Sequence, residues 1–239
     1  MSTTAITGEN SIKITNNHIE VDCDRDTTSS VSFAGICLCA DRFSHPVENI
    51  TIKNNTIIFI NTTNIKNLNV SASTTGGINF NSGYPDYMNL IIEGNIILNS
   101  PSSGIFIGTS NSLADVELEN ISIINNIIKD NGYYTNNGVY TAGIELGFLN
   151  YKNINIHSNI LSNINDKVYA FRILVRQDAT VENCSFYDNI LDYPNASTAL
   201  ILDIYNSFIY RNLDKIPLKS PNGAIHYISI NNNGEMVIS

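Results

Sequence analysis

The segment Asn120-Ile-Ser-Ile-Ile-Asn-Asn126 decides the fold, because it is one copy of a sequence motif that occurs seven times along the 239 residues. Each copy of this motif is called a line below. In each copy an asparagine opens the line, apolar residues alternate with polar ones, and an asparagine closes it. This alternation is the pattern of a β-strand with one face in a core. The closing asparagines are Asn17, Asn55, Asn95, Asn126, Asn159, Asn189 and, in a degraded copy, Asn212. Their separations of 23 to 40 residues predict one coil of a solenoid per copy.

The closing asparagine is predicted to be structural. A solenoid strand must bend where the next face of the coil begins, and asparagine tolerates the left-handed backbone conformation of such bends. In successive coils the side-chain amides can also hydrogen-bond to one another as a ladder. We therefore expect both a left-handed backbone and an amide ladder at these positions.

A further strand follows each line and begins at a glycine or an alanine. These starting residues are Gly35, Gly77, Gly104, Gly143, Ala170 and Ala199. A short apolar pair such as Ile127-Ile128 lies between the line and this strand, so that each coil has two or three strands. The absence of an amphipathic helical segment argues against a leucine-rich repeat, whose units are also shorter, at about 20–29 residues.

The line and the strands that follow it resemble the pectin-lyase-like superfamily of right-handed parallel β-helices, over residues 9–213. This resemblance implies an all-β fold, a single-domain right-handed parallel β-helix of about seven coils, at residues 1–213. Superfolds host many functions, so the resemblance says little about chemistry.

The last residues, 214–239, break the repeat and are predicted to form a C-terminal β-hairpin, with turns at Ser220-Pro-Asn-Gly223 and Asn233-Gly234. This tail resembles the short ends of phage tail and appendage proteins, which implies a homotrimeric spike or fibre on the virion tail, an extracellular location. The alternative is an ordinary hairpin that caps the last coil.

Composition narrows the class of partner. The net charge of −9 disfavours nucleic acid and anionic membrane surfaces. The chain has no run of 18 apolar residues, and residues 1–8 show no signal peptide pattern. A neutral glycan is compatible with this charge, and a bacterial surface carbohydrate is the partner that the resemblance to phage tail proteins implies.

Insertions are predicted at one corner of the coil. The segment between the closing asparagine and the next strand is longest at residues 20–33, 58–75 and 129–141. Such insertions often mark the binding face of a solenoid. Tyr133, Tyr134 and Tyr140 in the third insertion are candidates for stacking on sugars; the alternative is that they cover a coil end or contact a neighbouring subunit.

The strand that begins at the glycine supplies the candidate catalytic residues. Its outward positions are predicted to be Cys37, Asn79, Phe106, Glu145, Arg172 and Ile201, followed by Cys39, Asn81, Gly108, Gly147, Leu174 and Asp203. Glu145 and Asp203 are two coils apart, about 10 Å at the usual interstrand spacing. Inverting glycosidases separate their two carboxyl groups by about 6.5–9.5 Å. We therefore predict Glu145 and Asp203 as acid and base.

The predicted substrate-binding residues are Arg172, Arg176, Asp178, Asn79 and the three tyrosines. The predicted function is that of a phage tail spike-like module that binds and depolymerises a bacterial surface polysaccharide without a cofactor. A surface ion-pair ladder, Glu145–Arg172 and Arg176–Asp203, is the structural alternative.

Two other functions stay open. One is a non-enzymatic glycan-binding module or structural virion fibre. The other is a bacterial polysaccharide lyase, for which calcium would be needed and for which the acidic run Asp22-Cys-Asp24-Arg-Asp26 is the loose candidate. No metal site is predicted beyond this run.

Overall fold

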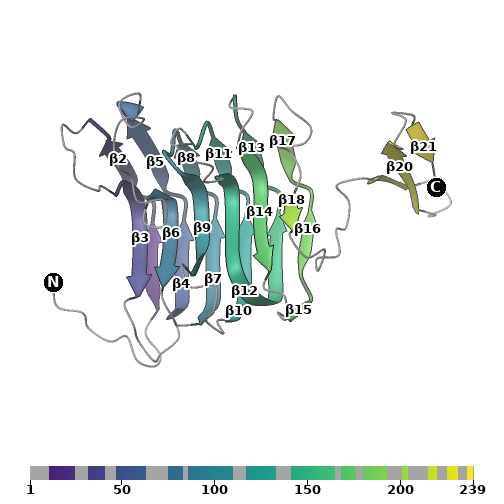
Figure 1. The fold of residues 1–239 in the computed structure, drawn as a ribbon, viewed down its shortest axis with the longest axis horizontal. Coiled ribbons are helices and arrows are strands. Elements are labelled where there is room, and N and C mark those ends of the chain that lie inside the picture. The colour runs from purple at the N-terminus through teal and green to yellow at the C-terminus, as the bar shows by residue number, and fades with distance from the viewer. Residues whose placement is uncertain are drawn as a thin grey trace.

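The computed structural model describes residues 11–24, 32–40, 47–62, 75–82, 86–109, 117–132, 141–164, 168–175, 180–192, 201–203, 215–219, 225–230 and 236–238. Most of these residues lie in β-strands, as Figure 1 shows.

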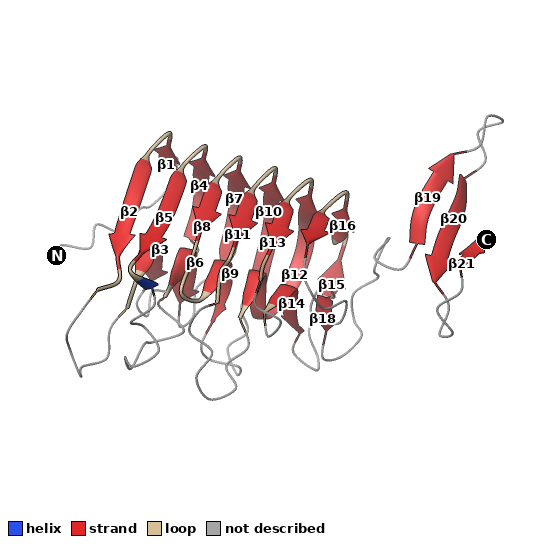
Figure 2. Cartoon of the chain, turned by 90° about the horizontal axis from the view of Figure 1, so that it is seen from above, coloured by secondary structure: helices blue, strands red, loops and turns tan. Residues whose placement is uncertain are grey.

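The strands form three parallel sheets that run along the solenoid (Figures 1 and 2). The first sheet contains β1 (Ile12–Thr15), β4 (Val47–Lys53), β7 (Tyr87–Glu93), β10 (Glu117–Ile124), the second half of β12 (Ala142–His157), β15 (Val181–Glu182) and β16 (Ser185–Tyr187). The second sheet contains β2 (His18–Asp22), β5 (Thr56–Ile60), β8 (Ile96–Leu98), β11 (Ile127–Lys129), β13 (Ile160–Ser162) and β17 (Ile190–Asp192). The third sheet contains β3 (Ala34–Ala40), β6 (Gly76–Ser82), β9 (Ser103–Thr109), the first half of β12, β14 (Tyr169–Val175) and β18 (Ile201–Asp203).

Each coil takes one strand or strand pair from each sheet in turn, so the predicted parallel β-helix is confirmed. Six coils lie in the part of the chain that the structure describes, against about seven predicted, and the seventh line, which closes at Asn212, falls outside the described residues. The long connections after β2, β5 and β11 join the second sheet to the third. The insertions therefore lie at one corner, as the spacing predicted.

The C-terminal residues form a separate antiparallel sheet of β19 (Lys215–Lys219), β20 (Ile225–Ile230) and β21 (Met236–Ile238). The predicted hairpin of β20 and β21 is confirmed. The structure adds β19, which pairs with β20 from residue Lys215 to Lys219. The residues of the two predicted turns lie outside the described part.

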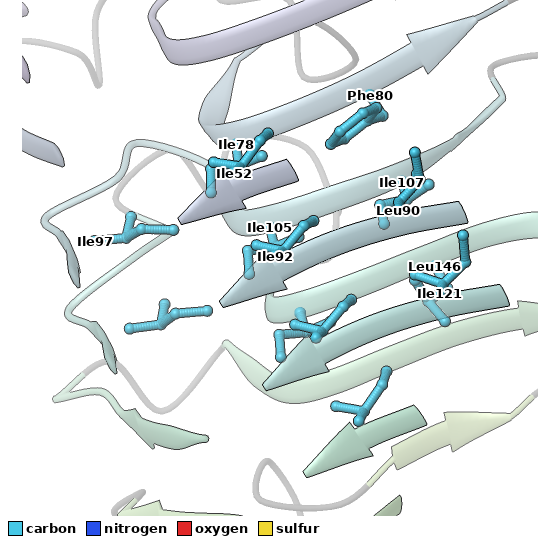
Figure 3. Packing of buried hydrophobic residues seen from close by; sticks show 14 of the residues in the cluster. Ile52, Ile78, Phe80, Leu90, Ile92, Ile97, Ile105, Ile107, Ile121 and Leu146 are labelled. Carbon is cyan, nitrogen blue, oxygen red and sulfur yellow. The ribbon is translucent and has the colours of Figure 1, made fainter. Parts of the chain in front are cut away.

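Apolar side chains of successive coils stack in rows inside the solenoid (Figure 3). Ile52 pairs in register with Ile92, and Ile78 pairs with Ile105, and all four side chains are buried. Burying such apolar surface stabilises the fold by about 25 cal/mol per Å². Like residues meet from coil to coil because the repeated line places them at the same position of each strand.

The closing asparagines form the predicted ladder. Nδ2 of Asn95 donates to Oδ1 of Asn126 at 3.0 Å, and the backbone N–H of Asn95 donates to the same oxygen at 2.9 Å. The other proton on Nδ2 of Asn95 is directed at the backbone oxygen of Ile52 in the preceding coil. The same exchange links Asn17, Asn55, Asn95, Asn126, Asn159 and Asn189.

The prediction of a left-handed backbone at the closing asparagine is wrong by one residue. The positive φ angles belong to the residue before it: Asn16, Asn54, Gly94, Asn125, Ser158 and Asp188. The preceding residue takes the left-handed conformation at the bend, and the closing asparagine then points into the wall, where its amide reaches the neighbouring coils. The two roles that we assigned to one residue are divided between two.

A second ladder runs along the outside of the first sheet. The opening asparagines Asn49, Asn89, Asn120, Asn153 and Asn183 all have φ between 51° and 59°. From Asn89 onward, Nδ2 of each residue donates to Oδ1 of the opening asparagine in the preceding coil, as Asn120 does to Asn89 at 3.0 Å. This direction is the reverse of that in the buried ladder. Because the outer amides are exposed to water, they contribute less to stability.

Glycine begins the third-sheet strand because another side chain occupies the space of a Cβ. A Cβ on Gly77 would lie 2.5 Å from Cγ2 of Ile97 and 2.5 Å from the backbone oxygen of Gly104. Gly35 and Gly104 meet Ile57 and Ile128 in the same way. The second and third sheets can therefore approach each other closely only at a residue without a side chain.

Replacing Asn126 by alanine is expected to lower the free energy of unfolding by about 2–5 kcal/mol, because two buried donors of Asn95 lose their acceptor. Urea unfolding measures the change. The control is Asn120→Gly in the exposed ladder, which keeps a residue tolerant of positive φ and is expected to cost less than about 1 kcal/mol. Equal losses for the two variants would contradict the structural role of the buried ladder.

Replacing Gly77 by alanine is expected to cost about 1–3 kcal/mol, because the added Cβ forces neighbouring backbone to move. Gly147→Ala is the matched control, since a Cβ there meets atoms only at 3.7 Å or beyond. Thermal or urea unfolding of both variants checks the prediction. A Gly77→Ala protein as stable as Gly147→Ala would show that the sheet spacing adjusts freely.

Candidate functional site

The predicted outward column of the third sheet is confirmed in register over five coils. Cys37 pairs with Asn79, Asn79 with Phe106, Phe106 with Glu145, and Glu145 with Arg172. The neighbouring column, two residues further along each strand, runs from Cys39 through Asn81, Gly108 and Gly147 to Leu174. The spacing from glycine to outward residue therefore predicted this part of the wall correctly.

Asp203 is the exception. It pairs with Ile173, whereas we predicted that it would pair with Leu174. The register between β14 and β18 thus differs by one residue from the repeat, with Arg172 beside Leu202. The repeat in the last coil begins Ala199-Leu-Ile-Leu202, and aligning Ala199 with Ala170 caused the error. Sheet pairing, which the repeat alone does not determine, shifts the strand by one position.

Glu145 lies at the centre of a polar cluster in the wall. Nη1 of Arg172, in the next coil, donates to Oε1 of Glu145 at 2.7 Å. Oγ of Ser103, in the preceding coil, donates to Oε2 at 2.5 Å. Oγ of Ser103 also accepts the backbone N–H of Ala142 at 3.2 Å, which leaves its single proton for the carboxylate. Both oxygens of Glu145 accept hydrogen bonds, as an ionised carboxylate does.

The backbone around Ser103 is itself held in place. Oγ of Ser100 donates to the backbone oxygen of Ser103 at 3.0 Å. Nδ2 of Asn131 donates to the backbone oxygen of Ser102, which directly precedes Ser103. It also donates to the backbone oxygen of Ala142, whose N–H binds Ser103. The bond from Asn131 to Ser102 joins coil four to coil three, and the other bonds donated by Ser100 and Asn131 act within one coil, so the serine that orients Glu145 is fixed by its neighbours.

Burial opposes the negative charge on Glu145. Desolvation raises the pKa of this carboxyl, while the Arg172 guanidinium and the hydrogen bonds from Ser103 and Arg172 act to lower it. The raised pKa shows that loss of hydration outweighs these favourable contacts. A carboxyl held this way binds its proton more tightly than one in water.

Two of the predicted site residues on the third sheet are shielded from solvent. Asn79 is fully buried and Glu145 is 6% exposed, although both stand on the outward column. Phe106 and Arg172 are half-buried, and Cys37 is exposed. Because both side chains are covered, Asn79 and Glu145 do not line an open groove.

Five of the predicted substrate-binding residues lie outside the described part of the chain. They are Arg176, Asp178, Tyr133, Tyr134 and Tyr140. The backbone of Asp203 is placed by its pairing with Ile173, but its side chain is outside the described part. Of the predicted residues, the structure therefore brings Glu145 and Arg172 into contact and places Asn79 two coils before Glu145 in the same column.

Ser103 was missed in the sequence. It is the first residue of β9, at a position where the other coils have Ala34, Gly76, Ala142 and Tyr169. A single serine at this position matches no catalytic motif. Only the register between coils shows that it reaches Glu145.

The acidic run proposed for a lyase is described only at its start. Oδ1 of Asp22 accepts the backbone N–H of Asp24 and the side-chain amide of Asn61, both at 2.9 Å. These bonds lower the pKa of Asp22, the amide of Asn61 contributing most. Within the described residues, no three His, Cys, Asp or Glu side chains gather as metal ligands do. In the same residues, we find no helix with the length and apolar character needed to span a membrane.

Stability should fall with rising pH because of Glu145. In the unfolded chain this glutamate titrates near about pH 4.3. In the folded protein its pKa is raised, so its stabilising contribution is present below about pH 4.3 and is lost as pH rises through the folded pKa. Glutamine does not titrate, so we expect the Glu145→Gln variant to lack this fall in stability. The free energy of unfolding of the wild type should therefore decrease relative to that of the variant as pH rises. Urea unfolding across this range measures the difference.

Glu145→Ala is the comparison variant, because it also removes the buried carboxyl and should therefore lose the same pH dependence as Glu145→Gln. Parallel pH profiles of Glu145→Gln and the wild type would contradict a raised pKa at Glu145.

Comparison with known proteins adds no family to this geometry. No protein-family model, no curated protein and no solved structure matches the chain. The parallel β-helix thus rests on the strand pairing itself, and any function has to be argued from the side chains of the wall.

Proposed function

We propose that this solenoid binds and depolymerises a polysaccharide at the outer side of its third sheet, with Glu145 as a catalytic carboxylate. The observation that carries the proposal is the buried Glu145–Arg172–Ser103 cluster. Placing a charged pair in a wall where an apolar pair would suffice costs desolvation energy. Carboxyl groups with raised pKa and a specific charged partner concentrate at functional sites.

The hydrogen bonds support the role of a base for Glu145. An ionised carboxylate between two donors can accept a proton from water or from a sugar hydroxyl, and its raised pKa makes it a better acceptor than a free glutamate. Arg172 then stabilises the charge before the transfer, and Ser103 orients the carboxylate. Asp203, the second carboxyl predicted from the sequence, pairs with the inward-facing Ile173 and lies outside the column of Glu145, so the proposal rests on Glu145.

A solenoid suits a polymeric ligand. Equivalent positions repeat about every 4.8 Å along the third sheet, and the strands that follow the long connections after β2, β5 and β11 all belong to it. A chain of sugars along this side contacts several coils at once, which a small ligand does not. The net charge of −9 favours a neutral glycan over a polyanionic one.

A non-enzymatic glycan-binding or fibre module is the second candidate. It is favoured by the burial of Glu145 and by the two donors that already occupy its oxygens. In that case the cluster only joins coils three, four and five. The placement on a virion tail and the bacterial surface glycan rest on the resemblance of the C-terminal hairpin, and they are part of the proposal. The homotrimer implied by the same hairpin stays a prediction, which the mass of the protein in solution tests.

Digestion of a panel of bacterial surface polysaccharides tests the activity. Wild-type protein is expected to release new reducing ends, and Glu145→Gln is expected to lower the rate by about 10²–10⁴-fold, as loss of a general base does. Asp203→Asn should give a comparable loss if it is the second carboxyl. Glu93→Gln, which breaks an ion pair on the first sheet, should retain full activity.

The products separate the alternatives. Unsaturated ends that depend on added calcium would identify a lyase, and binding without any product would favour the non-enzymatic module. Undiminished release by a folded Glu145→Gln protein would refute the assignment of Glu145.

A further inference from the structure

An apolar patch lies on the outside of the second sheet, away from the Glu145 cluster. Ile127, Ile160 and Ile190 stand beside one another in successive coils and are 37%, 39% and 61% exposed. Ile164, which follows β13, is 78% exposed. Four of the six large apolar residues found exposed in the described part of the chain therefore gather around β11, β13 and β17.

Two opposite charges flank this patch symmetrically. Lys129, Ser162 and Asp192 pair in register across the same three strands, two residues along from the isoleucines. Lys129 and Asp192 are both exposed. The lysine thus lies one coil before β13, and the aspartate lies one coil after it.

We infer that this patch binds a second copy of the chain, as a twofold pair of antiparallel solenoids with β13 at the axis. A twofold interface uses the same surface on both partners, so the surface must complement itself. Rotation about an axis along β13 places Ile127 of each copy against Ile190 of the other, and Ile160 against Ile160. The same rotation places each Lys129 against the Asp192 of the other copy.

The shape of the patch also favours a second copy over an unrelated protein. The isoleucines repeat about every 4.8 Å, and a second copy presents a ladder with the same period, so that all three isoleucines of each copy meet one of the other. Charge points the same way. In the twofold pair, Asp192 of each copy meets Lys129 of the other, so that opposite charges face each other across the contact.

The contact is small, so the pair is expected to be weak. Three strands span about 10 Å along the solenoid, well below the extent of a standard interface with about 800 Å² per partner. Dimer should therefore form only as the protein concentration rises. Neither the interface nor its test depends on cleavage of a glycan.

Analytical ultracentrifugation of the full chain at increasing concentration tests the pairing. Wild type is expected to shift from monomer towards twice the monomer mass. The double variant Ile127→Thr, Ile160→Thr is expected to weaken this association by at least about tenfold, since it removes the central apolar contact. Threonine is suitable because Thr56 occupies the same column in coil two. Ile91→Thr, at an exposed isoleucine of the first sheet, is the control and should dimerise as wild type does.

Charge reversal tests the antiparallel orientation. Lys129→Glu is expected to weaken the dimer about tenfold, and adding Asp192→Lys should restore it, because the two opposite charges then meet again. A monomer at every concentration, or a trimer mass, overturns the inference. A dimer unaffected by the isoleucine variants, or one that the second charge change does not restore, overturns it as well.

Discussion

Hydrogen bonding of one amide per coil holds the bend between the first and second sheets. Oδ1 of each closing asparagine accepts both the backbone N–H and the side-chain N–H of the asparagine in the preceding coil. Its own Nδ2 returns a bond to a strand oxygen of that coil, as Asn126 does to Ile92. Four coils have this asparagine fully buried, at Asn55, Asn95, Asn126 and Asn159. A buried amide without partners costs about 1–3 kcal/mol per group, so the coils can stack only where the next asparagine is in place.

The bend then positions the rest of the coil. Ile57, Ile97 and Ile128 follow the closing asparagines and point inward, where they occupy the space of a Cβ at Gly35, Gly77 and Gly104. The third-sheet strand that starts at each glycine places one residue of every coil in the column of Asn79, Phe106, Glu145 and Arg172. The asparagine ladder thus positions the row of isoleucines, and these isoleucines require the glycine. The glycine in turn starts the strand that carries Glu145.

The Glu145 cluster differs in physical character from the ion pairs of the first sheet. Lys53–Glu93 and Lys152–Glu119 join neighbouring coils with their lysines about two-fifths exposed, so water screens them. Glu145 is shielded, and desolvation raises its pKa even beside Arg172. The same charge pairing therefore adds little at one face, whereas at the other it partly offsets the desolvation that raises the pKa of Glu145. This contrast makes Glu145 the candidate for function, and it makes Glu93 the suitable control.

Sequence by itself determined the period of the coil, the inward residues of each line, the ladder and the column from Cys37 to Arg172, because strands alternate and equivalent positions of a repeat must stack. Tertiary structure alone decided what the repeat does not encode. The left-handed residue is Asn125 and its equivalents, since the closing amide has to reach into the wall. Asp203 lies beside Ile173, since pairing between β14 and β18 sets its own register. The hydrogen bond from Ser103 to Glu145 and the burial of Glu145 were also decided by the tertiary structure. Both depend on contacts between residues about 40 positions apart in the chain, which no local sequence pattern records.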